Sequence, residues 1–122
     1  MAILFHITTH HDWAIALAAG AYRPASLALE GFIHCSTSAQ ATATANRYFA
    51  GRDDLVLLCI DDTQLGAPLR YEPPLAPNPG PNPRADERFP HLYGPLELSA
   101  VLRVVDFPPG PDGSFELPAG LP

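Results

Sequence analysis

Ile3, Phe5 and Ile7 alternate with Leu4, His6 and Thr8, which predicts a β-strand with one strongly apolar face and His6 on the opposite side. Thr9 and Asp12 then have the spacing of a helix capping box, and Gly20 supplies a stop signal. The apolar side chains between these signals recur at helical spacing: Trp13, Ala16 and Leu17. This part of the chain therefore predicts a strand followed by a short amphipathic helix.

A second strand is predicted in EGFIHCS, Glu30 to Ser36, after a connecting stretch over residues 21–30. Alternation along a strand places its side chains on two faces: Phe32, His34 and Ser36 on one, Ile33 and Cys35 on the other. Cys35 is therefore expected to point away from His34, into the core.

A second helix is predicted directly after that strand. Thr37 and Gln40 repeat the capping-box spacing, and Gly51 is the expected end. The side chains expected to form its buried stripe are Ala41, Ala45, Tyr48 and Phe49.

The second half of the chain is dominated by strand patterns. The apolar run from Asp54 to Asp61 is typical of a central strand buried on both faces. Further strands are expected at Leu69 to Glu72, at Ala100 to Phe107 and, more weakly, at Ser114 to Leu117. Residues 73–83 are rich in proline, which removes backbone donors, so they predict a long loop.

The order of these elements favours an α+β fold. Two short helices lie in the first half, and no strand–helix alternation follows, so we expect a mixed or antiparallel sheet rather than a doubly wound parallel one. The 122 residues suit a single domain, 1–122, with an ordered core over about residues 3–107 and a C-terminal tail over 108–122.

Composition narrows the possible functions. All seven basic residues are arginines, so a lysine Schiff base is excluded. The formal charge of −6 argues against a nucleic-acid surface. No apolar run approaches the roughly 20 residues of a membrane span, so we expect no membrane partner and a cytoplasmic location, with both cysteines reduced.

Three histidines lie inside ordered-looking segments, namely His6, His34 and His91, and imidazole titrates near neutral pH. The strongest local argument concerns His34 and Ser36, because the helix that follows could offer backbone N–H groups to a phosphate. The alternative is that Ser36 or Thr37 only caps the helix and that His34 packs beneath it.

Two further regions offer candidate site residues. Tyr22 and Glu30 flank the connection to the second strand, and loops at such places often carry function. The segment FPHLYG could present His91 and Tyr93 to a pocket from a rigid loop. In the alternative interpretation, its aromatic residues only anchor the proline-rich loop.

Other chemistries have weaker patterns. There is no G-x-S-x-G motif, which argues against a Ser–His–acid nucleophile. Three imidazoles, His6, His34 and His91, could hold a zinc ion with an open position for water, but no H-x-H or HExxH spacing supports this, and we expect no metal.

The chain resembles the bacterial domain-of-unknown-function family numbered 952 over Leu4 to Val105. The matching segments are FHI at 5–7, Trp13, GAY at 20–22, SL at 26–27, EGFIHCS, Gln40, AN at 45–46, LLCID, and FPHLYGPL. That family is distantly similar to the ADP-ribosyltransferase-like superfamily, including RNA 2'-phosphotransferases, whose split α+β fold binds NAD.

This resemblance implies a role for each matching residue. His6 would hold the nicotinamide ribose, IHCS and its helix would form part of the NAD cleft, and Arg47 would correspond to an arginine of the phosphotransferases. The catalytic glutamate of many such transferases has no clear match, since FPHLYG offers His91 where an acid is expected.

We therefore expect an ADP-ribosyltransferase-like domain that binds NAD or a related nucleotide, with transfer of ADP-ribose as its candidate activity. Its candidate residues fall into two sets: His34, Glu30 and His91 as catalytic, and His6, Tyr22, Ser36 and Tyr93 as cofactor-binding. Two alternatives stay open: a non-catalytic module that binds a nucleotide or metabolite, and a zinc hydrolase using the three histidines.

Overall fold

The computed structural model describes residues 2–73 and 87–121, so nearly all of the predicted proline-rich loop lies outside the described residues. The helices are α1 (His10–Ala19), α2 (Ala25–Glu30) and α3 (Ser38–Tyr48), with 3-10 turns η1 (Asp62–Gln64) and η2 (Leu98–Ala100). The strands are β1 (Ile3–Thr9), β2 (Ala21–Tyr22), β3 (Ile33–His34), β4 (Leu55–Asp61), β5 (Leu69–Glu72), β6 (Phe89–Leu92), β7 (Leu96–Glu97) and β8 (Val101–Asp106).

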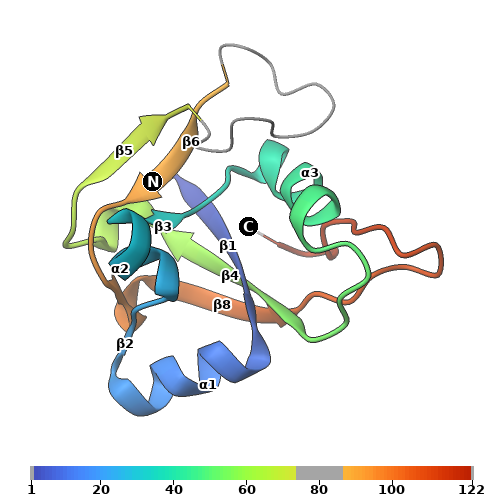
Figure 1. The fold of residues 1–122 in the computed structure, drawn as a ribbon, viewed down its shortest axis with the longest axis horizontal. Coiled ribbons are helices and arrows are strands. Elements are labelled where there is room, and N and C mark those ends of the chain that lie inside the picture. Colours follow the sequence, from blue (N-terminus) through green and yellow to red (C-terminus); the bar gives the residue numbers. More distant parts are fainter. Residues whose placement is uncertain (1, 74–86, 122) are drawn as a thin grey trace.

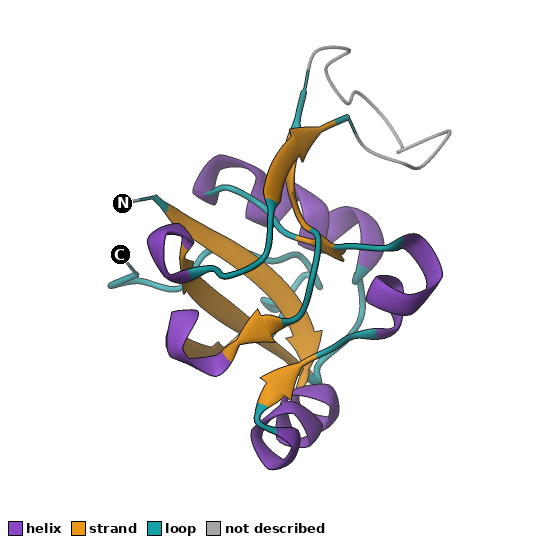
Figure 2. Ribbon diagram, turned by 90° about the vertical axis from the view of Figure 1, so that its left-hand side faces the viewer, coloured by secondary structure: helices purple, strands orange, loops and turns teal. Residues whose placement is uncertain are grey.

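The described strands form three antiparallel sheets, ordered β1-β4-β8, β2-β7 and β3-β6-β5. A bridge between Phe5 and Ser36 connects the first sheet to the chain that leaves β3. The helices lie around the outside of these strands (Figure 2). The α+β prediction is confirmed, and of its two options the antiparallel one is correct.

β4 is the central strand of the β1-β4-β8 sheet, and every one of its residues is buried. Alternate side chains of β1 and β4 point to opposite faces, so Leu4 and Leu58 enter one apolar cluster while Phe5 and Leu57 enter another. Both strands cross the middle of the molecule (Figure 1). The continuous apolar run of β4 follows from this double burial, as its sequence predicts.

Most of the residues predicted to begin and end the helices of the first half do so in the structure. The Thr9 hydroxyl accepts from the backbone N–H of Asp12. Gly20 ends α1 with φ of 86°, a conformation that glycine adopts without strain. Thr37 and Gln40 form the predicted reciprocal capping box of α3.

Several predictions differ from the structure. The connecting stretch contains a further helix, α2, so the prediction of two helices is wrong; Pro24 occupies its N-cap and Gly31 its C-cap. The α3 helix ends at Tyr48, before Gly51. Two side chains assigned to apolar helix faces are exposed, Leu17 of α1 by 57% and Tyr48 by 52%, because each lies on the side of its helix away from the core.

The C-terminal segment packs on the second apolar cluster without forming the predicted strand at 114–117. Phe115 is only 1% exposed, and its backbone N–H donates to the Asn46 side chain at 2.7 Å. The side-chain amide of Asn46, rather than a neighbouring strand, satisfies this backbone donor. Among the helices of the described residues, none is long and apolar enough to cross a bilayer.

Candidate functional site

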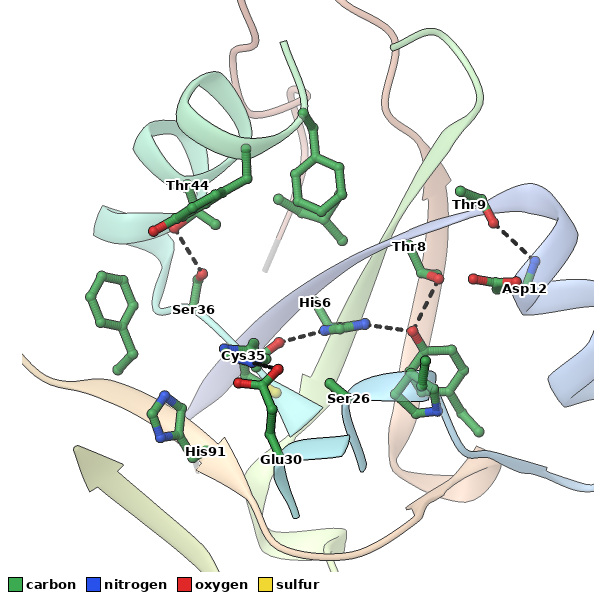
Figure 3. Close-up of a pocket in the computed structure, with 18 of the residues that line it drawn as sticks. His6, Thr8, Thr9, Asp12, Ser26, Glu30, Cys35, Ser36, Thr44 and His91 are labelled. Atoms are coloured by element: carbon green, nitrogen blue, oxygen red, sulfur yellow. Dashed lines mark hydrogen bonds and ion pairs between the residues drawn. The ribbon is translucent and has the colours of Figure 1, made fainter. Parts of the chain in front are cut away.

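A pocket of about 830 Å³ opens beside the end of β3, between β1, α2 and the flank of α3. The predicted site residues that line it are His6, Tyr22, Glu30, His34, Ser36 and His91. They come from segments far apart in the sequence, and in Figure 3 His6 lies between Thr8 on one side and Glu30 and His91 on the other. The structure thus brings the three candidate histidines into one cavity.

His6 is held by both of its ring nitrogens. Nδ1 lies 2.5 Å from the carbonyl oxygen of His34, and Nε2 lies 2.7 Å from the phenol oxygen of Tyr22. Burial lowers the pKa of His6 to about 4, so the ring is neutral at pH 7. A carbonyl can only accept, so the single ring proton is on Nδ1 and Nε2 accepts from Tyr22.

Tyr22 extends this network to Thr8. The phenol oxygen lies 3.0 Å from the Thr8 hydroxyl oxygen, and the phenol ring meets the His6 ring edge-on at 5.1 Å. Burial raises the pKa of Tyr22 to about 12, so the phenol keeps its proton. Thr8, Tyr22 and His6 therefore form an uncharged chain of hydrogen-bonding groups along one wall of the pocket.

His34 and Glu30 form a hydrogen-bonded pair at the rim of the pocket. Nε2 of His34 lies 3.0 Å from Oε1 of Glu30, and the two side chains are 46% and 36% exposed. The positive φ of Gly31, 90°, ends α2 and turns the chain so that residues four apart meet. The strand predicted over 30–36 is therefore too long: Glu30 is the last residue of α2, and β3 covers only Ile33–His34.

His91 is almost fully buried, at 2% exposure, and lies opposite His34 in the β3–β6 pairing. Its Nδ1 lies 2.9 Å from Oε1 of Glu72, and Phe32 stacks on its ring at 4.1 Å. Burial lowers the pKa of His91, and the hydrogen bond to Glu72 opposes that effect.

Tyr93 is not among the residues that line the pocket. Its hydroxyl donates to Oε1 of Glu72 at 2.5 Å, and its ring contacts Phe32 at 5.2 Å between centroids. The structure therefore places Tyr93 behind His91 and Glu72 rather than on the pocket wall.

Ser36 lies on the wall, where its hydroxyl donates to the Thr44 hydroxyl at 3.4 Å. The first turn of α3 contributes no residue to the pocket wall, because the capping box occupies the N-terminal end of the helix. The flank of α3 faces the cavity instead. The α3 residues on the wall are Thr44, Arg47 and Tyr48. The anion-binding helix terminus that we predicted is therefore not part of this pocket.

Sequence reasoning missed three charged residues at this place: Asp12 and Arg52 line the pocket, and Glu72 binds His91 behind the wall. Arg52 lines the pocket and is held by Asp54 through two hydrogen bonds, at 3.0 and 2.6 Å. The only available signal for Arg52 was its position just after α3. Glu72 had none, because its contact with His91 depends on the pairing of β5 with β6 across the proline-rich segment.

The zinc alternative has no geometric support. Within residues 2–73 and 87–121, no group of three or more His, Cys, Asp or Glu side chains is arranged to hold a metal ion. His6 already uses both nitrogens, so it could ligate a metal only by breaking one of these bonds. Cys35 is a buried free cysteine, and burial raises its pKa to about 12, so it is a poor nucleophile.

Comparisons with known proteins agree on the family. The crystal structure of protein CC0527 from Caulobacter crescentus is 35% identical, covers 94% of each chain and superimposes with a TM-score of 0.79. The solution NMR structure of CC0527 is 36% identical, covers 93% of this chain and 91% of that one, and has a TM-score of 0.74. A search of curated proteins found no match.

Residues 7–104 match the family described as "Protein of unknown function (DUF952)", in agreement with the resemblance carried by EGFIHCS and FPHLYGPL. The similarity to ADP-ribosyltransferases is not among these findings. On the family match and the covered length, the chain belongs to the DUF952 family.

Proposed function

We propose that the pocket binds NAD or a related nucleotide and that the domain transfers ADP-ribose from it. The observation that carries this proposal is the convergence of His6, Tyr22, His34 and His91 on one cavity of about 830 Å³. That volume falls in the range of sites for ligands of this size, roughly 300–1,000 Å³. The distant resemblance to NAD-binding transferases supplies the identity of the ligand.

The uncharged wall suits a ribose. A ribose hydroxyl both donates and accepts, and the phenol of Tyr22, the neutral imidazole of His6 and the hydroxyl of Thr8 can do the same between them. Ligand binding would exchange one of these internal hydrogen bonds for one to the sugar. The low pKa of His6 keeps a buried positive charge out of this subsite.

The arginine side of the pocket suits the diphosphate. Arg47 and Arg52 both line the cavity, and a guanidinium can donate two parallel hydrogen bonds to phosphate oxygens. Arg47 also lies 5.9 Å from the ring centre of Tyr48. Asp54 already binds Nε and one Nη of Arg52, so Arg52 would meet the diphosphate with the N–H groups that Asp54 does not use.

The carboxylate of Glu30 is the candidate group for stabilising the reaction. When nicotinamide leaves, positive charge develops on the ribose, and a fixed negative charge nearby lowers the energy of that state. Glu30 lies at the rim, held by His34. We therefore assign Glu30 the electrostatic role and His34 the role of holding it.

The test combines calorimetry with an assay for released nicotinamide. Wild-type protein is expected to bind NAD and to release nicotinamide. His34→Ala is expected to keep most of the binding and to lose at least about 10-fold in release, because Glu30 loses its partner. His11→Ala is the matched control, since His11 is exposed and lies outside the pocket.

The outcomes separate the proposal from its main alternative. Binding of NAD without release of nicotinamide would support a non-catalytic nucleotide-binding module. The partial exposure of Glu30 favours this alternative, because solvent screens the charge of the carboxylate. If wild-type protein neither binds nor cleaves NAD or a related nicotinamide nucleotide, the proposed function is wrong.

A further inference from the structure

A second carboxylate–histidine pair lies deeper than the one at the rim. Glu72 on β5 and His91 on β6 are diagonal neighbours on the face of the sheet that also carries His34, and Nδ1 of His91 lies 2.9 Å from the Glu72 carboxylate. His91 is 2% exposed and lines the pocket, whereas Glu72 does not line it.

The partners of His91 determine where its proton is. A carboxylate can only accept, so Nδ1 carries the hydrogen and Nε2 of the neutral ring has the free lone pair. Within the part of the chain that the structure describes, Nε2 of His91 has no hydrogen-bond partner. Every fully buried side-chain nitrogen or oxygen in that part has a hydrogen-bond partner. Nε2 is therefore not fully enclosed, and the cavity that His91 lines is the pocket.

The pair is held rigidly in place. Phe32 stacks on the His91 ring with 21° between the planes, and the Tyr93 hydroxyl donates to the same carboxylate oxygen of Glu72. Arg70 covers the Tyr93 ring at 5.1 Å. A histidine that only filled the core would not need a carboxylate on one nitrogen and open space on the other.

The charged and titratable groups around His91 come from several elements. Glu72 and Arg70 belong to β5, His34 to β3 and Glu30 to the end of α2, and Tyr93 follows β6. Glu72 and Glu30 favour the protonated ring, while His34 and burial disfavour it. Among the residues that the structure describes, only Glu72 hydrogen-bonds a ring nitrogen of His91.

We propose that His91 is the general base that activates an oxygen nucleophile in this pocket and that Glu72 is its positioning residue. The choice of reaction rests on the proposed function. The lone pair of Nε2 takes the proton of a bound alcohol or water, whose oxygen forms a bond to C1' of the ribose. The bond from C1' to nicotinamide breaks, and its electron pair stays on the nicotinamide nitrogen.

The products are an O-linked ADP-ribose, neutral nicotinamide and a protonated His91. The negative charge of Glu72 stabilises this imidazolium. An alcohol or water suits this base, because its proton becomes acidic only as the new C–O bond forms, when a weak base suffices. A guanidinium or ammonium acceptor would first have to lose a proton, for which a histidine of lowered pKa is poorly suited.

The first test observes the ring of His91 directly, without ligand. Nitrogen NMR of ¹⁵N-histidine-labelled protein is expected to show the Nδ1–H neutral tautomer at His91. In Glu72→Gln, the amide can either donate or accept, so the Nε2–H tautomer should appear and the pKa of His91 should fall further. An Nε2–H tautomer in the wild type, or no change in Glu72→Gln, would overturn the proposal.

The second test measures nicotinamide release. Glu72→Gln should lower kcat by about 100-fold, the scale of general-base catalysis, with the Kd for NAD changed less than about 2-fold. The low-pH limb of the pH profile of kcat should move to lower pH, because the variant lacks the negative charge of Glu72 that favours protonated His91. Glu116→Gln, an exposed glutamate outside the pocket, is the matched control and should match wild type.

The two measurements distinguish a failure of the proposed function from a failure of the assignment of His91 and Glu72. If NAD does not bind to the wild type, the proposed function is wrong, and the NMR tautomer still decides whether Glu72 presents Nε2 of His91 as a base. If NAD is cleaved and Glu72→Gln has normal kcat and an unchanged profile, the proposed function stands and the assignment of His91 and Glu72 is wrong.

Discussion

His6 links the pocket to the stability of the whole chain at the level of one side chain. Its folded-state pKa is about 4, well below the ordinary value of 6.5, because burial disfavours the charged ring. Below pH 6.5 the unfolded chain takes up a proton on this residue that the folded protein does not. The free energy of unfolding should therefore fall as pH drops from about 6.5 to about 4.

The size of this effect follows from the two pKa values and is about 3 kcal/mol at most. Urea denaturation of wild type and His6→Gln at pH 7, 5.5 and 4.5 measures it. The variant should be less stable at pH 7, but it should lose less stability on acidification. His11→Gln should follow wild type, and an equal acid dependence in His6→Gln would contradict the assignment.

The residues of the site differ in how far the sequence could predict them. His6, His34 and Ser36 were found because strand alternation and a following helix mark them. Their partners were not, because the hydrogen bonds of His6 to Tyr22 and to the His34 carbonyl span 16 and 28 residues. Local pattern carries no information about contacts over such separations.

At the scale of elements, one glycine sets the angle between α2 and β3. Gly31 has a φ of 90°, which is strained for any residue with a side chain, although nothing lies within 4 Å of where a Cβ would be. We expect Gly31→Ala to destabilise the protein by about 1–2 kcal/mol and to weaken the Glu30–His34 pair, because the turn positions both.

Gly113→Ala provides the matched control, with a φ of 82° and the same free space, at a turn whose residues do not line the pocket. Both variants should lose similar stability in urea denaturation. Only Gly31→Ala should also reduce nicotinamide release. Equal activity in the two variants would show that the turn does not position the site.

The predictable elements are those with strong local signals. β1, β4 and the caps of α1 and α3 follow from alternation, continuous apolarity and capping-box spacing. α2 was missed because a six-residue helix after a proline has too few turns to show a period. The two-residue strand β2 was missed too, because it exists only through its pairing with β7.

At the scale of the whole molecule, β4 joins two apolar clusters, and its neighbours β1 and β8 also contribute side chains to both. Leu58 belongs to the cluster that Trp13 packs against, whereas Leu57 belongs to the cluster beneath α3. Because adjacent residues of one strand serve both, neither cluster can lose its order while the other keeps β4 in place. We therefore expect the described core to unfold as one unit.

Leu57→Ala tests this cooperativity, since it removes buried contacts from the second cluster only and should cost about 2–5 kcal/mol. Trp13, the only tryptophan, reports on the first cluster by fluorescence, and circular dichroism reports on the whole chain. Both signals should shift to the same lower urea midpoint. Leu29→Ala is the control, because Leu29 is 82% exposed, and the free energy of unfolding from either signal should change by no more than about 0.5 kcal/mol. If the Trp13 transition of Leu57→Ala stays at the wild-type urea midpoint, the two clusters unfold independently.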